Sequence, residues 1–148
     1  MEYHYDLSRF AAAQQDSYRQ ALAEIQNGRK RSHWMWYIFP QIHGLGKSST
    51  SQLYAIQSLD EAKAFLSHPC LGKNLLEISQ ALLLLDTNDT GAVFGWPDEL
   101  KLKSSMTLFH QADPDQPVFQ AVLDKYFNGE QDPNTLKIIR KEENSYAV

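Results

Sequence analysis

Residues 29–51 read RKRSHWMWYIFPQIHGLGKSSTS, and the rest of the sequence is organised around this stretch. It opens with three cations and continues with two tryptophans, a tyrosine, a phenylalanine, two histidines and a Gly-x-Gly turn. Such a composition is too aromatic for a plain linker and too cationic for a plain core segment. Residues 32–39 are too short for periodicity to decide between a short helix and a buried extended segment; we favour a short helix with Ser32 as its N-cap. Pro40 biases Phe39 away from the α region and closes the segment.

The sequence on either side of this stretch predicts amphipathic helices. Apolar residues recur at helical spacing from Leu7 to Asn27, and Gly28 is placed to end that helix. Ser58 and Glu61 have the spacing of a capping box, which predicts a helix start. Further helices are expected over residues 69–85, 97–109, 118–127 and 132–139.

The predicted fold class is all-α, because the alternating patterns of β-strands are largely missing from the sequence. We expect one compact domain over residues 1–148, with about seven or eight helices and short connections. The charged tail from about residue 141 is expected to fray.

The composition is that of a soluble globular protein. With 148 residues, of which 43% are hydrophobic and 22% charged, the chain can bury one core without a disulfide. Cys70 is the single cysteine and no two histidines have metal-ligand spacing, so neither a metal nor another cofactor is expected. Residues 1–10 lack the features of a signal peptide, and no apolar run could span a bilayer, which predicts a cytoplasmic protein without membrane contact.

Several longer motifs resemble a known family. They are RSHWMWYIFPQIHGLGKSS (31–49), YAI (54–56), HPCLG (68–72), FG (94–95) and KLKSSMTLF (101–109). Together they resemble the domain-of-unknown-function family 1810 over nearly the whole chain; members of that family are sometimes labelled calpastatin-like. The resemblance implies a mainly α-helical single domain and implies no activity. An inhibitor of the calpastatin type is disordered, whereas this composition is that of a folded core.

The rings and cations of the aromatic stretch are the first candidates for a ligand site. Trp34 and Trp36 face different directions on a helix, and their rings either pack in the core or line a pocket for a planar ligand. Arg31, followed by Ser32, is the cation expected to point inward, where its guanidinium can hold a phosphate or a carboxylate. The alternative for the cations is a solvated helix end.

The glycine turn copies a phosphate-binding loop only in part. Gly46-Lys47-Ser48 matches the end of a P-loop, but the pattern needs a glycine where the chain has Gln41, and no strand precedes it. A Walker site is therefore rejected. The remaining expectation is that backbone N–H groups and hydroxyls gather around one concavity, with an ordinary glycine turn as the alternative. The residues expected there are Gln41, Gly44, Gly46, Lys47, Ser48 and Ser49.

A second polar cluster lies in the helix expected over residues 97–109. Lys101 and Ser104 share one helical face and are expected to meet the glycine turn and complete an anion pocket, unless the small hydroxyls only allow close helix packing. His33, between an arginine pair and a tryptophan, is the candidate for acid–base catalysis; the alternative is a structural hydrogen-bonding role. His43 and Asp98 are weaker candidates.

Three functions fit these residues. The first is a pocket for a small anionic ligand, phosphate-bearing and aromatic like a nucleotide, with hydrolysis or glycosidic transfer as the reaction if one occurs. The second is a protein-interaction module that exposes tryptophan and arginine. The third, single-stranded nucleic-acid binding, is disfavoured by the formal net charge of −4. A polar-lined recess favours the first and a flat, exposed tryptophan patch the second. The oligomeric state does not follow from the sequence.

Overall fold

The computed structural model describes residues 5–146, and this range contains nine α-helices. They are α1 (Ser8–Gln26), α2 (Met35–Ile38), α3 (Ser49–Leu53), α4 (Leu59–Ser67), α5 (Leu71–Leu83), α6 (Thr90–Phe94), α7 (Asp98–Ala112), α8 (Pro117–Phe127) and α9 (Pro133–Tyr146). The β pairing found in the described range is an isolated parallel bridge between Ile42 and Ile56. The all-α prediction is therefore confirmed. Within residues 5–146, every helix is too short or too polar to cross a membrane.

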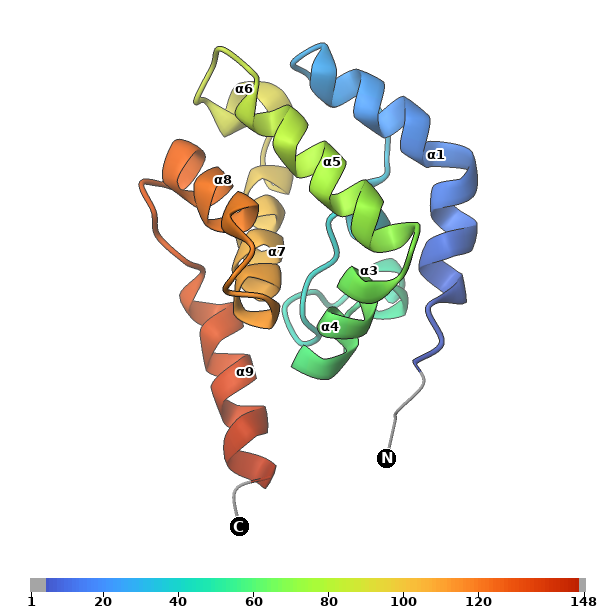
Figure 1. Cartoon of the computed structure of the whole chain (residues 1–148), viewed down its shortest axis with the longest axis vertical. Helices are drawn as coiled ribbons and strands as arrows, with labels where there is room; N and C mark the ends of the chain where they lie inside the picture. Colours follow the sequence, from blue (N-terminus) through green and yellow to red (C-terminus); the bar gives the residue numbers. More distant parts are fainter. Residues whose placement is uncertain (1–4, 147–148) are drawn as a thin grey trace.

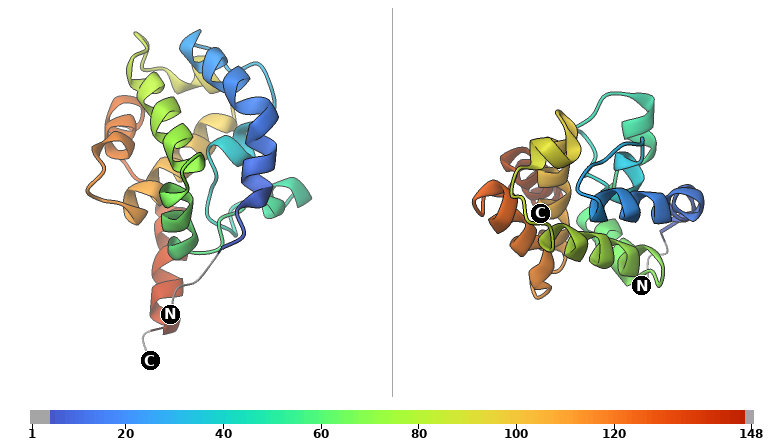
Figure 2. Two further views of the ribbon diagram at one scale, coloured as in Figure 1. Left: turned by 45° about the vertical axis from the view of Figure 1, so that its right-hand side comes forward. Right: turned by 90° about the horizontal axis from the view of Figure 1, so that it is seen from above.

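The long helices pack around a shared core. Figure 1 shows α1 and α5 side by side, with α8 on the other side of α5 and α7 behind them. Helix α7 packs against α4, α8 and α9. The segment between α1 and α4, which carries α2 and α3, lies beside α1 (Figure 2). The helical part of the aromatic stretch, α2, therefore packs on α1.

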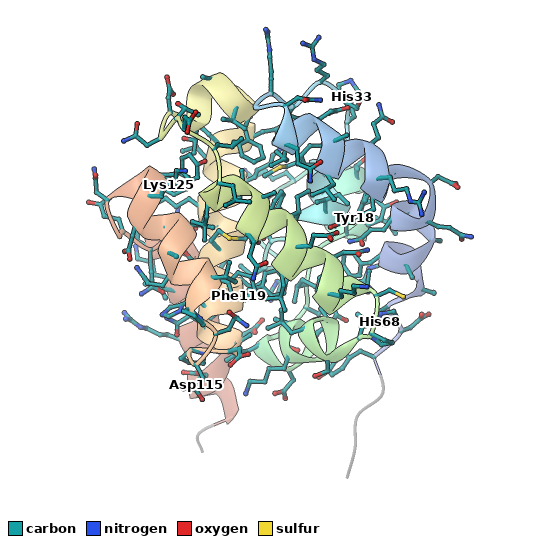
Figure 3. The ribbon with its side chains drawn as sticks, turned by 45° about the horizontal axis from the view of Figure 1, so that its top comes forward. Tyr18, His33, His68, Asp115, Phe119 and Lys125 are labelled. Carbon is teal, nitrogen blue, oxygen red and sulfur yellow. The ribbon has the colours of Figure 1, made fainter. Side chains whose placement is uncertain are left out.

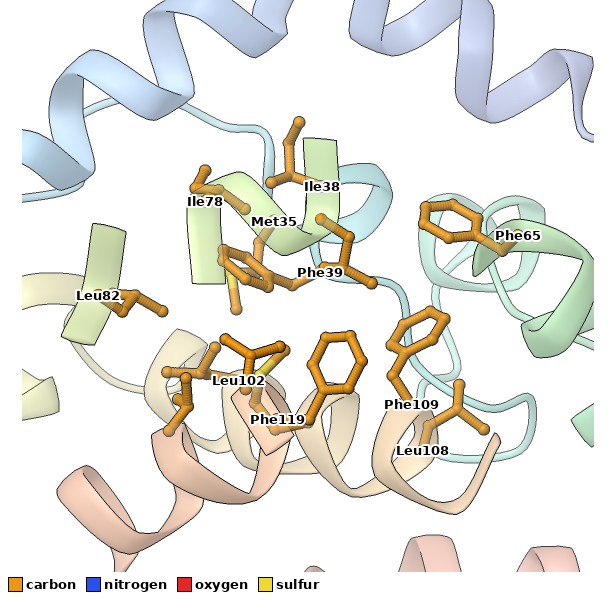
Figure 4. Packing of buried hydrophobic residues seen from close by; sticks show 14 of the residues in the cluster. Met35, Ile38, Phe39, Phe65, Ile78, Leu82, Leu102, Leu108, Phe109 and Phe119 are labelled. Carbon is orange, nitrogen blue, oxygen red and sulfur yellow. The ribbon is translucent and has the colours of Figure 1, made fainter. Parts of the chain in front are cut away.

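Helix α7 supplies much of the core. All side chains from Ser104 to Phe109 are buried, including hydroxyl residues in the middle of the run. The Phe109 ring packs against Phe65 and Phe119, with ring centres 5.3 and 5.9 Å apart (Figure 4). Small hydroxyl side chains let the surrounding helices approach closely. The sequence leaves two roles open for the polar residues of this helix, an anion pocket or close helix packing, and the burial of these hydroxyl residues fits the packing role.

The prediction of seven or eight helices is slightly low because α3 and α6, with five residues each, are too short to show a helical period in the sequence. Helix α3 lies in a polar run that reads as a loop, and it begins where the Ser48 hydroxyl accepts a hydrogen bond from the Ser51 N–H (3.1 Å). Helix α6 begins in the same way at Asp89, whose carboxylate accepts from the Ala92 N–H (3.2 Å). Side-chain caps, rather than hydrophobic periodicity, mark the starts of both helices.

Other helix ends test the capping predictions directly. The Ser58 hydroxyl accepts from the Glu61 N–H (3.1 Å), which confirms the predicted start of α4. Gly28 follows α1 with a φ of +82°, the left-handed conformation expected of a glycine just beyond a helix. The start of α2 is a correction: this helix begins at Met35 rather than at Ser32. Helix α9 continues past residue 141 as far as Tyr146.

Candidate functional site

One buried carboxylate fixes the start of the aromatic stretch. Glu24, on α1, is 8% exposed and accepts hydrogen bonds from the backbone N–H groups of Arg31 (2.7 Å) and Ser32 (2.9 Å). It also accepts from the Ser32 hydroxyl (2.7 Å) and the Trp34 indole N–H (2.9 Å). Burial acts to raise the pKa of Glu24, but these four hydrogen bonds together lower it to about 2. Because Ser32 is engaged by Glu24, it does not cap α2, and the Trp34 ring is held in the core.

Asp98, at the start of α7, joins two segments that are distant in sequence. Its carboxylate is paired with Lys30 Nζ at 2.9 Å and with Lys101 Nζ at 3.2 Å. Lys30 Nζ lies 5.1 Å from the centre of the Trp34 ring, and Lys101 Nζ lies 4.8 Å from the centre of the Trp36 ring. The aromatic stretch and the first turn of α7 therefore lie together, and a cation lies over each of these indole rings.

A pocket of about 400 Å³ lies beside Trp36. All of its lining residues come from one part of the chain, residues 36–57, which runs from α2 to just before α4. Such a volume suits a small molecule. The lining combines aromatic rings, three amides, two hydroxyls and two glycines, and it contains no lysine, arginine, aspartate or glutamate. The residues that line it are Trp36, Gln41, Ile42, His43, Gly44, Gly46, Ser51, Gln52, Tyr54, Ala55 and Gln57.

Backbone contacts between two passes of the chain build the pocket wall. The His43 N–H donates to the Ile56 carbonyl (2.9 Å), and the Ile56 N–H donates to the Gln41 carbonyl (2.8 Å). Arg9 of α1 supports this wall by donating to the Ala55 carbonyl (2.9 Å) and by pairing with the Glu61 carboxylate (2.9 Å). The wall is thus fixed to both α1 and α4.

The two glycines of the turn serve different purposes. Gly44 has a φ of +92°, which side chains rarely allow. At Gly46 the reason is close approach, because a Cβ atom there would lie 2.5 Å from the Ser51 hydroxyl oxygen. Ser51 is itself tied down by donating to the Ser48 carbonyl (2.9 Å). Both glycines therefore let the turn close against the first residues of α3.

His43 is the histidine that lines the pocket, and α9 holds its ring. The Nε2 atom of His43 is hydrogen-bonded to the Glu142 carboxylate. Ile138, one turn earlier on α9, approaches the same loop, with its Cδ1 3.4 Å from the position that a Cβ of Gly44 would occupy. When Nε2 carries the proton that Glu142 accepts, Nδ1 is the basic nitrogen of the ring. This arrangement orients a potential general base at the pocket.

Four predicted site residues line the pocket: Trp36, Gln41, Gly44 and Gly46. Lys101 contacts the Trp36 ring without lining the pocket. The three predicted residues that follow Gly46 are exposed at the start of α3: Lys47, Ser48 and Ser49.

The other predicted residues lie elsewhere. Trp34 is buried at 1% exposure, and Arg31 is exposed and contributes its backbone N–H to Glu24. His33 is exposed on the outside of the molecule near the end of α1 (Figure 3). Ser104 is buried, and its hydroxyl lies 3.1 Å from the carboxylate of Asp132, the residue before α9. The hydroxyl of Ser104 therefore helps to position α9.

The sequence pattern does not indicate Tyr54, Gln52 or Gln57 as site residues, and it favours His33 over His43 as the acid–base candidate. Amides and a tyrosine just after a polar run have no distinctive spacing, and such side chains are most often solvated. The one feature of the sequence that could have indicated these residues is their position just after the glycine turn, because a turn there can bring the following residues back towards Trp36. Within residues 5–146, no group of three or more His, Cys, Asp or Glu side chains is arranged to hold a metal ion.

Comparison with known proteins indicates the fold and leaves the activity open. The family described as "Protein of unknown function (DUF1810)" matches residues 4–139. The 1.38 Å crystal structure of the conserved hypothetical protein Rv1873 from Mycobacterium tuberculosis is similar, with a TM-score of 0.90 and 43% sequence identity over 92% of this chain and 97% of that chain. None of the curated proteins matches the sequence. The chemistry of the pocket is therefore the basis for a functional assignment.

Proposed function

The chain belongs to the family of proteins of unknown function DUF1810, and we propose that it binds a small aromatic metabolite, similar to a nucleotide, in the pocket beside Trp36. The observation that carries this proposal is the lining itself. Aromatic rings, three glutamine amides and a glycine turn meet around about 400 Å³ of space. Ligand sites commonly combine apolar and aromatic surface with a few placed polar groups.

The rings of Trp36 and Tyr54 supply the surface for a planar ligand. Tyr54 is braced by other rings, with ring centres 5.3 Å from Tyr37 and 6.0 Å from Phe10. Trp36 is braced by the cation of Lys101. Rings that are already fixed lose little freedom when a ligand stacks on them. Stacking of a base on an aromatic side chain contributes about 1–3 kcal/mol.

The anionic part of a nucleotide-like ligand needs cations near the pocket. Lys47 follows the lining residue Gly46 and is exposed, and Lys101 lies against Trp36. The neighbouring Ser48 hydroxyl is already engaged by Ser51, to whose hydroxyl it donates (2.9 Å), so Lys47 is the main contact for an anion there. We assign the phosphate to this region, outside the lining.

His43 takes the acid–base role in any hydrolytic or glycosidic reaction at this pocket. Its ring lines the pocket and is oriented by Glu142, whereas His33 is exposed and lies outside the lining. A general base must reach the proton it removes, so geometry favours His43.

Tryptophan fluorescence tests the proposal. The Trp96→Phe variant removes the indole that is 78% exposed, and leaves Trp34 in the core and Trp36 at the pocket as the reporters. Titration with the 5′-monophosphates of adenosine, guanosine, cytidine and uridine is expected to give a saturable change for at least one of them below about 1 mM. Tyr54→Leu in the same background should weaken that binding about tenfold, from the lost stacking. The absence of saturable binding by all four nucleotides would contradict the proposal.

A protein-interaction module is the second candidate function. Trp34 and Trp36 do not form a flat exposed patch, since one is buried and the other lines the pocket. Trp96, just before α7, is exposed, however, and Leu100, in the first turn of α7, is 51% exposed. Exposed tryptophans are frequent at interfaces. Light scattering at increasing protein concentration tests self-association, which Trp96→Ala should abolish if this surface is the contact.

A further inference from the structure

The pocket lining offers no uncompensated charge to a buried anion. No lining residue is a lysine or an arginine, and any charge on the lining residue His43 is matched by Glu142. Lys101, whose Nζ lies over the Trp36 ring, is paired with Asp98. A charged group moved from water into such a site loses its hydration without gaining a counter-ion. A phosphate inside the lining would therefore be unfavourable.

The arginine that supports the pocket wall is also occupied. Arg9 donates to the carbonyls of Leu53 (2.8 Å) and Ala55 (2.9 Å), and its guanidinium is paired with the Glu61 carboxylate (2.9 Å). These contacts use its donors for holding the wall. The recognition chemistry of the pocket is therefore left to uncharged groups.

The three lining amides offer an unequal set of donors and acceptors. The Nε2 group of Gln52 donates to the Lys47 carbonyl (3.1 Å), and that of Gln57 donates to the Ala55 carbonyl (3.2 Å). Each of these two amides keeps its carbonyl oxygen as an acceptor. Among the described residues, the Gln41 amide makes no side-chain hydrogen bond, so it keeps both a donor and an acceptor. The Gln52 and Gln57 amides each also keep their second N–H, so four N–H donors remain against three carbonyl oxygens, each of which has two lone pairs. Acceptor sites therefore still outnumber donors among the three amides.

We infer that the pocket recognises the uncharged, amino-bearing edge of a nitrogen heterocycle, as in adenine or cytosine, and that the phosphate adds little to affinity. This inference rests on the proposed function and specifies which part of the ligand is recognised. An exocyclic amino group donates to the Gln52 and Gln57 carbonyl oxygens, while the Gln41 amide pairs with a neighbouring ring nitrogen and amino group, as amides do with adenine.

Calorimetric titration of the full chain tests this inference with eight probes. These are adenosine and cytidine, which carry the amino group, inosine and uridine, which carry a carbonyl in its place, adenosine and cytidine 5′-monophosphates, inorganic phosphate, and ribose. Adenosine or cytidine is expected to bind within about threefold of its monophosphate and about tenfold more tightly than inosine or uridine, respectively. The affinity for the uncharged nucleosides adenosine and cytidine should change less than about twofold between 50 and 300 mM salt, since these ligands form no ion pair.

Substitution of the amides separates recognition from folding. Gln41→Leu and Gln57→Leu keep the side-chain volume and remove the hydrogen-bonding groups, and each should weaken adenosine or cytidine binding about tenfold. Gln80→Leu, at an exposed position on α5 outside the pocket, is the matched control and should bind like the parent protein. Circular dichroism and the melting temperature establish that each variant is folded.

The outcomes distinguish this inference from the function on which it rests. Tight binding of the monophosphates with weak, salt-sensitive or absent binding of the nucleosides would overturn the inference and leave the nucleotide pocket in place. Equal binding of inosine and adenosine, and of uridine and cytidine, would also overturn it. No binding of any nucleoside or nucleotide would remove both the inference and the proposed function.

Discussion

Glu24 determines the path of the chain after α1, although it lies outside the aromatic stretch. Its carboxylate collects four hydrogen bonds from Arg31, Ser32 and Trp34, so a single side chain replaces the hydrogen bonds that a regular element would supply. This contact places Trp34 in the core and directs Trp36, two residues later, to the pocket. The aromatic stretch therefore divides its two indole rings between the core and the pocket lining.

Acid should weaken the fold through Glu24. Its pKa is lowered from the ordinary 4.5 to about 2, so its stabilising effect is complete above pH 4.5 and is lost as the pH falls towards 2. Between pH 6 and pH 3 this one group accounts for about 2 kcal/mol of unfolding free energy. Urea denaturation at the two pH values measures the loss. Glu24→Gln should be less stable at pH 6 and should lose about 2 kcal/mol less on acidification. Asp16→Asn, exposed on the same helix, is the control and should retain the full pH dependence.

Gly72 is a second residue on which the fold depends. A Cβ atom at this position would lie 2.0 Å from the backbone carbonyl oxygen of Leu66, near the end of α4. Gly72→Ala must therefore move backbone, and we expect it to lower the unfolding free energy by about 1–3 kcal/mol. Thermal denaturation measures the change. Gly91→Ala is the matched control, because its new methyl group would first meet a side-chain oxygen of Asp89 at 3.2 Å; equal melting temperatures for the two variants would contradict the expectation.

At the scale of helices, sequence periodicity predicts what each helix does by itself. The long helices α1, α5 and α8 and the capping box of Ser58 follow from local patterns. The pocket residues Trp36, Gln41, Gly44 and Gly46 could be predicted because they lie in one unusual stretch. The remainder of the site depends on contacts between elements, such as Arg9 with Ala55 or His43 with Glu142, and no periodicity reports these.

Helix α3 should depend on its cap more than on packing, because it has no buried residue. Ser48→Ala removes the acceptor of the Ser51 N–H and is expected to cost about 1 kcal/mol. Hydrogen exchange should become faster over residues 49–53 in particular. Ser49→Ala is the control, since the Ser49 side chain is exposed and no hydrogen bond is found for it among the described residues. Equal exchange in the two variants would show that the cap does not hold α3.

At the scale of the whole molecule, the pocket draws on both halves of the chain. Arg9 of α1 holds one side of the wall, and Ile138 and Glu142 of α9 contact the other. Helix α9 extends well beyond the rest of the helices in Figure 1, yet its inner face meets the glycine turn. The pocket is consequently a property of the folded molecule, and an unfolded chain has no equivalent site.

A ligand of the pocket should therefore raise the melting temperature. At one hundred times its dissociation constant, a ligand that binds only the folded state adds about 2.7 kcal/mol to the unfolding free energy. For a chain of this size the corresponding shift is about 5–10 °C. Scanning calorimetry with the tightest-binding nucleoside measures this shift, and Tyr54→Leu at the same ligand concentration should show a smaller one. An unchanged melting temperature at saturation would mean that the ligand does not favour the folded state.

The pairing of His43 with Glu142 has a consequence for the newly made protein. The ribosome adds Glu142 99 residues after His43, so a nascent chain carries the histidine, the glutamines and both pocket rings long before their support on α9 exists. Nascent domains fold as their segments emerge. A ligand of this pocket would therefore bind only late in translation. It would bind chains whose synthesis has reached α9 and not shorter nascent chains.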